Sequence, residues 1–267
     1  MVNLFLYPGM LTTLVLGWLF GLLANERIAW RPSAWRQASM TTEGVLGLAS
    51  LLAAGVAPAL LPFPFTATPM ASGWVWTWAL VEAAFLLPLL PALSTPSPLV
   101  ARAAIREAQI GVGGRAVLWL ALGLALTSGR GAGWLAISAT LMALAGAALA
   151  LPIALGAGPF AAETGVTPGG SDGGLTTSVT SLFTTIRTIR AAALVAIAAA
   201  ALVPTERLGT VSGLGLVSTL FLLGAWLLGR IRGRWVRLPL PVALRFCWFI
   251  ATPLVVAAVG LWVLEIR

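Results

Sequence analysis

Glu82 is the residue of this sequence that is best placed to do chemistry, because it is a carboxylic acid inside the apolar stretch LVEAAF. A charged side chain at the centre of a membrane-spanning helix costs roughly 2.5–3.5 kcal/mol, so an ionisable residue there suggests a function. The sequence near Glu82 contains no basic residue that would pair with it. Two interpretations stay open: a carboxylate that takes up and releases a proton on an interior polar path, and a neutral acid that is hydrogen-bonded across a helix interface.

Arg187 and Arg190 are the next candidates, since they lie three positions apart in the segment TTIRTIR and would share one helix face. Helical side chains lean toward the N-terminus, so both arginines could reach back to the lipid headgroups. In the alternative, they are buried, and they line a cavity or pair with an acid of the glycine-rich connection 156–174. That connection carries Glu163 and Asp172. The candidates for a proton path are therefore Glu82, Glu163, Arg187 and Arg190.

The residue types that are missing limit the chemistry of this chain. It contains no histidine and a single cysteine, Cys247. A haem, zinc or iron–sulfur site built from the usual ligands is therefore not expected within this chain, and any redox chemistry is expected to belong to another subunit. The glycine-rich segments 111–114 and 169–174 are not followed by the lysine and the hydroxyl residue that complete a phosphate-binding loop.

The elements that position these residues follow from the composition. The chain has 267 residues, of which 59% are hydrophobic and 9% charged, whereas soluble domains are about a quarter charged. Because a spanning helix needs about 20 apolar residues, the sequence predicts an all-α, polytopic integral membrane protein with a single domain, 1–267, and about eight spans. The expected spans are 4–24, 44–62, 74–93, 112–129, 133–157, 178–203, 210–229 and 241–264.

The arginines of the short loops predict the orientation. They gather after the first span, around the beginning of the fourth and after the seventh, whereas the opposite side carries only Arg130, Arg207 and Arg267. Positively charged loops stay in the cytoplasm, so both termini are expected outside, in the inner (plasma) membrane. Trp74, Trp76 and Trp78 would then form an aromatic cluster at the outer interface.

The cytoplasmic connections are the expected docking surface for a partner. Ser97-Pro98 is typical of a helix start and predicts a short helix, 97–110, along the membrane surface. Glu107 is expected there on a solvated face, Glu43 in the first turn of the second span, and Arg245 as an interfacial anchor. The docking candidates are Arg102, Arg106, Asp172, Arg230, Arg232, Arg234 and Arg237.

The last predicted span carries a motif, FCWFIATPL over 246–254, that follows an arginine-rich segment and Leu238-Pro239. It resembles the C-terminal F-x-W-x₄-P-L segment of one family of membrane subunits of bacterial NADH-quinone oxidoreductase, the counterparts of mitochondrial complex I subunit 1. Related subunits occur in energy-converting membrane-bound [NiFe] hydrogenases. Glu26-Arg27, the Arg106 to Gln109 segment and Pro159-Phe160 agree with that family in order.

The resemblance implies a membrane-anchor subunit that binds antiporter-like membrane subunits and a peripheral iron–sulfur subunit, with a quinone at a shared site. The chain departs from the family along its carboxylate-rich path. An aromatic–Glu pair corresponds here to Gly113-Gly114-Arg115, and an acidic loop is reduced to Glu163 after Pro159-Phe160. The alternative hypothesis is an independent polytopic transporter or channel, although such proteins usually carry more intramembrane polar residues.

Overall fold

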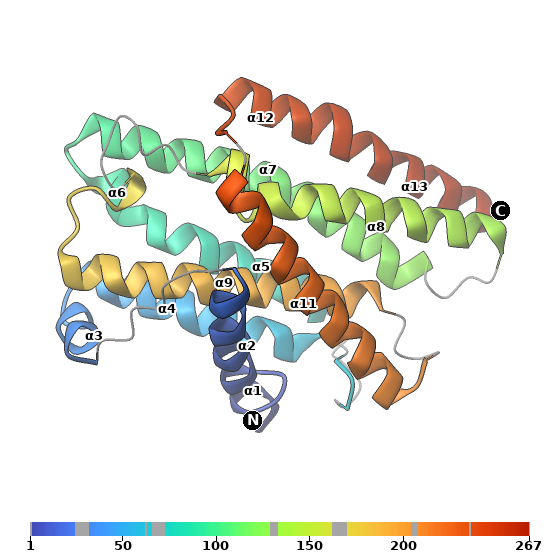
Figure 1. Ribbon diagram of the computed structural model, residues 1–267, viewed down its shortest axis with the longest axis horizontal. Helices are drawn as coiled ribbons and strands as arrows, with labels where there is room; N and C mark the ends of the chain where they lie inside the picture. Colours follow the sequence, from blue (N-terminus) through green and yellow to red (C-terminus); the bar gives the residue numbers. More distant parts are fainter. Residues whose placement is uncertain are drawn as a thin grey trace.

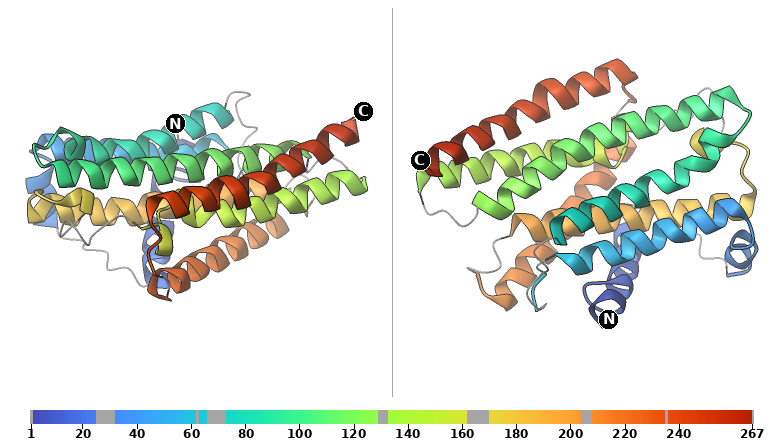
Figure 2. Two further views of the ribbon diagram at one scale, coloured as in Figure 1. Left: turned by 90° about the horizontal axis from the view of Figure 1, so that it is seen from above. Right: turned by 180° about the vertical axis from the view of Figure 1, so that it is seen from behind.

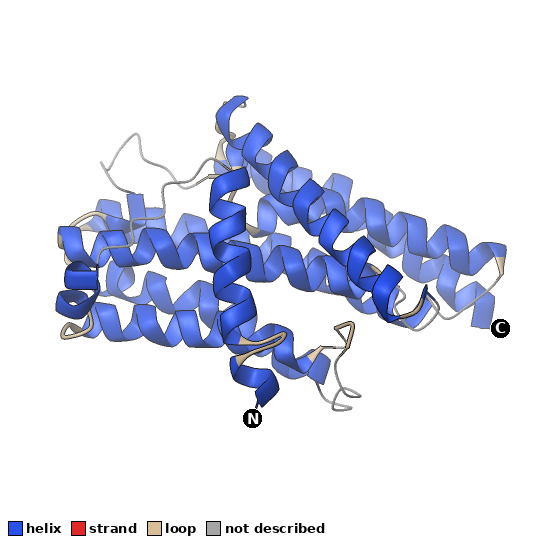
Figure 3. Ribbon diagram, turned by 60° about the horizontal axis from the view of Figure 1, so that its bottom comes forward, coloured by secondary structure: helices blue, strands red, loops and turns tan. Residues whose placement is uncertain are grey.

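The computed structural model of the protein describes residues 2–24, 32–61, 63–65, 73–128, 133–161, 170–203, 208–234 and 236–266. Over these residues it consists of helices and connecting segments, without a strand (Figure 3). The long helices are apolar, as the sequence predicts, so the protein is an all-α, multi-pass membrane protein.

Seven helices of the described residues are long and apolar enough to cross a membrane. They are α4 with the short turn η1 (Thr42–Val56, Ala57–Leu60), α5 with η2 and α6 (Gly73–Leu86, Leu87–Leu89, Leu90–Ser94), α7 (Pro98–Ser128), α8 (Trp134–Ala154), α9 (Thr177–Leu202), α11 (Thr210–Arg234), and α12 with η5 and α13 (Leu240–Phe246, Cys247–Ala251, Thr252–Ile266). The turns η3 (Gly158–Phe160) and η4 (Gly170–Asp172) and helix α3 (Pro32–Ala38) lie between them.

The first expected span, 4–24, is shorter than predicted. It is divided into α1 (Val2–Phe5) and α2 (Met10–Leu23), and α2 has 14 residues. At 1.5 Å per residue, α2 is about 21 Å long, which is less than the roughly 30 Å hydrocarbon core. Pro8 and Gly9 interrupt the apolar stretch, because proline lacks the N–H of a helix interior and glycine favours a break.

The prediction of a separate surface helix at 97–110 is wrong. Helix α7 begins at Pro98, as the Ser97-Pro98 signal predicts, but continues without a break for 31 residues. The glycines at 111, 113 and 114 do not end it, because Gly114 is packed directly against α8. A Cβ atom at Gly114 would lie 2.5 Å from the backbone nitrogen of Ala154. Gly114 therefore permits close helix packing rather than a turn.

Helix α9 lies at the centre of the bundle. Every residue from Thr188 to Ala201 is buried, and α9 contacts α2, α3, α4, α7 and α11. Figure 1 shows α2 running steeply across α9, with α11 crossing obliquely beside it, and Figure 2 shows both helices on the same side of the bundle. The crossing of α2 and α9 is close at Gly17, where a Cβ atom would lie 2.8 Å from Cγ1 of Ile189.

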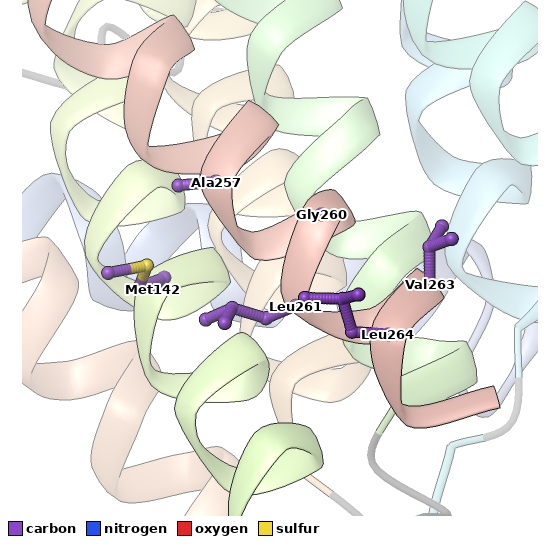
Figure 4. A pocket seen from close by; sticks show the side chains of 6 residues that line it. All are labelled: Met142, Ala257, Gly260, Leu261, Val263 and Leu264. Atoms are coloured by element: carbon purple, nitrogen blue, oxygen red, sulfur yellow. The ribbon is translucent and has the colours of Figure 1, made fainter. Parts of the chain in front are cut away.

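Helices α8 and α13 lie side by side next to α7 (Figure 1). Between them is a shallow groove of about 580 Å³. Figure 4 shows the residues that line it, all of them apolar: Met142, Ala257, Gly260, Leu261, Val263 and Leu264. A groove of this kind offers no side chain for chemistry, and the polar residues lie elsewhere, between α5, α7 and α9.

Candidate functional site

Six ionisable side chains form a continuous line inside the bundle, which we call the charge ladder. Its members, in order, are Asp172, Arg187, Glu107, Arg190, Arg115 and Glu82. They come from α5, from α7 and from the consecutive elements η4 and α9, three parts of the chain that are far apart in the sequence but adjacent in the fold. Three arginines alternate in part with three carboxylates, so the ladder has no net formal charge.

The inner end of the ladder is a bidentate ion pair between Arg115 and Glu82. The Nε of Arg115 donates to Glu82 Oε1 at 2.9 Å, and its Nη2 donates to Oε2 at 2.9 Å. Arg115 is 2% exposed. Its guanidinium fits because Gly111, one turn earlier, has no side chain: a Cβ atom there would lie 2.7 Å from Nη1. The basic partner that is missing from the sequence near Glu82 therefore follows 33 positions later, on another helix.

Arg190 occupies the middle of the ladder and joins two helices. Its Nη2 lies 3.3 Å from Glu107 Oε1, and its Nη1 donates to the carbonyl oxygen of Phe85 at 3.3 Å. It also reaches the carbonyl of Ala84 at 3.5 Å, which accepts from Ser50 Oγ at 2.6 Å. The carbonyl of Ala84 is available because Pro88, four residues later, has no N–H to donate to it. A guanidinium at the C-terminal end of α5 is also favoured by the helix dipole.

The outer end of the ladder is closed by the η4 turn. Arg187 donates to both carboxylate oxygens of Asp172 at 2.7 Å. Ser171 Oγ donates to Glu107 Oε2 at 2.7 Å and accepts from Arg187 at 3.0 Å. Burial raises the pKa of Asp172, while the Arg187 guanidinium opposes that shift. Of the two alternatives for Arg187 and Arg190, the paired arrangement is the one observed: Arg190 is buried, and Arg187, whose side chain is 33% exposed, pairs with Asp172. The solvated face expected for Glu107 is wrong, because its carboxylate pairs with Arg190.

The ring of Phe85 lies between the two halves of the ladder. The Cζ atoms of Arg115 and Arg190 each lie 4.5 Å from the centre of this ring. A guanidinium over an aromatic face is attracted by the ring quadrupole, by about 2 kcal/mol when both groups are desolvated. Phe85 therefore connects the inner pair to the outer cluster through cation–π contacts, in place of a carboxylate.

The other predicted residues are not part of the ladder. Glu163 lies outside the described residues. Arg106 donates to the carbonyl of Leu238 at 2.6 Å, which ties α7 to the segment before α12. Glu43 is in the first turn of α4, as expected. Among the other arginines singled out as docking candidates or interfacial anchors, four are exposed: Arg102, Arg230, Arg237 and Arg245. Arg232 is half-buried, and nothing is described of the Arg234 side chain.

A second pocket, of about 370 Å³, lies beside the outer end of the ladder. It is lined by residues of α4, α6 and the segment after η4, including Glu43, Ser94, Thr95, Gly173 and Leu175. Glu43 has no ion pair among the described residues. The pocket therefore brings a carboxylate and hydroxyl groups next to the turn that carries Asp172.

Two members of the site, Arg115 and Glu107, were not expected from the sequence. One signal was present: Gly111 and Arg115 are four apart, so a glycine precedes an arginine on the same helix face inside an apolar stretch. Since each ladder carboxylate is paired with an arginine, the ladder is suited to relaying a change of charge rather than to holding a metal ion.

Neither a scan against protein-family models nor a search of curated proteins finds a match to this chain. The fold and the ladder define the class: a multi-pass, all-α membrane protein whose core contains ion pairs from three spans.

Proposed function

We propose that this protein is the membrane-anchor subunit of a complex I-like or membrane-bound hydrogenase-like oxidoreductase, linking a peripheral redox arm to proton- or ion-translocating membrane subunits. The observation that carries the proposal is the charge ladder, which connects the η4 turn to Glu82 through contacts of 2.7–4.5 Å.

Stability alone is a weak reason for such a ladder. Taking two charges out of water often costs more than their attraction returns, and replacing a buried ion pair by apolar residues is often neutral or stabilising. A coupling role gives a better reason. If one carboxylate takes up a proton, its arginine loses that counter-charge and can move toward the next carboxylate. In a low dielectric, such a change alters the electrostatic energy of the neighbouring ladder members strongly.

The resemblance of the last span supports the same assignment and indicates the partners. Iron–sulfur, flavin or nickel–iron centres would belong to a peripheral subunit, and a quinone could bind at a site shared with it. We place that subunit at the cytoplasmic end of the bundle, near Asp172 and the exposed Arg102, with both termini outside and the chain in the inner membrane.

The test is the number of protons moved per electron in inverted membrane vesicles that contain the native complex. Glu107→Gln keeps the shape of the side chain but removes its charge, so we expect normal assembly and fewer protons per electron. Glu265→Gln is the matched control, because Glu265 lies on α13 and makes no ladder contact. Unchanged pumping in Glu107→Gln would refute a coupling role. If the protein purifies as a homo-oligomer without redox subunits, the alternative hypothesis of an independent transporter or channel would be favoured.

A further inference from the structure

The C-terminal end of α11 presents a cation on an aromatic ring. The Cζ atom of Arg230 lies 5.0 Å from the centre of the Trp226 ring. Both residues are exposed, and Arg230 has neither a hydrogen bond nor an ion pair with the described part of the chain. The ring holds the guanidinium in place, while its N–H groups donate no hydrogen bond to the described residues. Such a guanidinium can donate hydrogen bonds to an anionic ligand.

The surrounding sequence has one sign of charge. Between 208 and 264 the chain carries five arginines and no acidic residue. They are Arg230, Arg232, Arg234, Arg237 and Arg245. Of these, Arg232 and Arg237 interact with other residues of the chain. The charge of this part of the sequence therefore favours an anionic ligand, and Arg230 is available to bind it.

The side chains below Arg230 are apolar and uncovered. Leu222 and Trp226 precede Arg230 at intervals of four residues, so the three form one stripe along α11. Leu222 is 41% exposed and Trp226 44%. Leu223 and Leu227 widen the stripe, with exposed fractions of 49% and 44%. Since α11 is long enough to span the membrane, an apolar stripe along it is suited to contact with lipid chains.

We infer that this end of α11 is a binding site for one anionic phospholipid, independent of the proposed function. The headgroup phosphate accepts hydrogen bonds from Arg230, Trp226 lies at the level of the headgroup, and an acyl chain follows Leu222 and Leu223. The docking surface of an acidic protein would need the arginines but not the apolar stripe beneath them. Arg230 therefore leaves the set of protein-docking candidates.

Titration with phosphatidylglycerol, followed by native mass spectrometry of the purified full chain, tests the site. Each arginine near a membrane surface contributes about a fivefold gain in affinity for anionic lipid, so Arg230→Ala should bind phosphatidylglycerol about fivefold more weakly. Arg102→Ala is the matched control for the general attraction between arginine and anionic lipid: Arg102 is also exposed but lies on α7 rather than beside Trp226 on α11. Its loss should therefore weaken the binding of phosphatidylglycerol less than the loss of Arg230 does. Phosphatidylcholine has the same phosphate but a choline cation that offsets its charge, so it should bind the wild type more weakly than phosphatidylglycerol and should lose less affinity on Arg230→Ala.

Two outcomes would overturn the inference. In the first, Arg230→Ala and the wild type bind phosphatidylglycerol equally. In the second, Arg230→Ala keeps its lipid affinity but loses a cross-link to an acidic subunit in the native membrane, which would return Arg230 to protein docking. Equal thermal stability of the variants in detergent excludes misfolding as the cause.

Discussion

At the scale of single residues, the inner ion pair is the most demanding feature of the protein. Arg115 is almost fully buried, and Glu82 accepts hydrogen bonds from its Nε and Nη2. The carbonyl of Ala154, at the end of α8, accepts from Nη1 at 3.4 Å. Without Glu82, the guanidinium would have no counter-charge within the contacts that it makes.

Loss of either partner should therefore cost more than loss of both. We expect Glu82→Leu to lower the free energy of unfolding by about 3–5 kcal/mol, because it leaves an uncompensated buried charge. The double variant Glu82→Leu, Arg115→Met should recover most of that loss. Thermal unfolding in detergent measures both. If the double variant is as unstable as the single one, the pair does not behave as an isolated unit.

Phe85 should matter beyond its volume. Phe85→Leu removes two cation–π contacts, so it should lower stability by about 1–3 kcal/mol more than the same change at an ordinary buried phenylalanine. Phe221→Leu is the control, because Phe221 is 2% exposed and no arginine of the described residues lies over its ring. Equal losses at the two positions would mean that Phe85 acts only by packing.

At the scale of elements, close contacts between helices hold the ladder in register. Gly114 precedes Arg115 and touches the backbone of α8 at Ala154, whose carbonyl Arg115 also reaches. The position of the guanidinium thus depends on how closely α7 approaches α8.

A methyl group at Gly114 should separate these helices. We expect Gly114→Ala to cost about 1–3 kcal/mol, because its Cβ would meet backbone atoms that cannot rotate away. The control is Gly260→Ala on α13, where a Cβ would meet nothing within 4 Å. Thermal unfolding of the two variants and of the wild type measures this difference in stability. A neutral Gly114→Ala would show that α7 and α8 can move apart freely.

The sequence predicted where most of the helices lie, but it could not predict the contacts between side chains of the site. Apolar length predicted the spans, and the Ser97-Pro98 signal predicted where α7 begins. The same glycines at 111–114 can end a helix or let two helices touch, and only the neighbouring α8 decides between these. The partner of Glu82 lies on another helix, so no local pattern points to it.

At the scale of the whole molecule, the orientation remains a prediction from arginine asymmetry. Cysteines introduced at Ser33 and Thr177, both exposed, should react with an impermeant reagent only from the cytoplasm, and a cysteine at Thr210 only from outside. A Cys247→Ala background is suitable because Cys247 is fully buried. Labelling at Thr177 from outside intact cells would reverse the orientation.

The charge ladder also constrains how the chain enters the membrane. A charge costs roughly 2.5–3.5 kcal/mol at the centre of a helix that is inserted alone, and five of the six ladder charges lie on spanning helices. During synthesis α5 arrives with Glu82, α7 then supplies Arg115 and brings Glu107, and α9 finally supplies Arg187 and Arg190. Each later helix carries the counter-charge of an earlier one. The three helices are therefore expected to leave the insertion machinery together, and a nascent chain that stops before α9 should be held there or degraded.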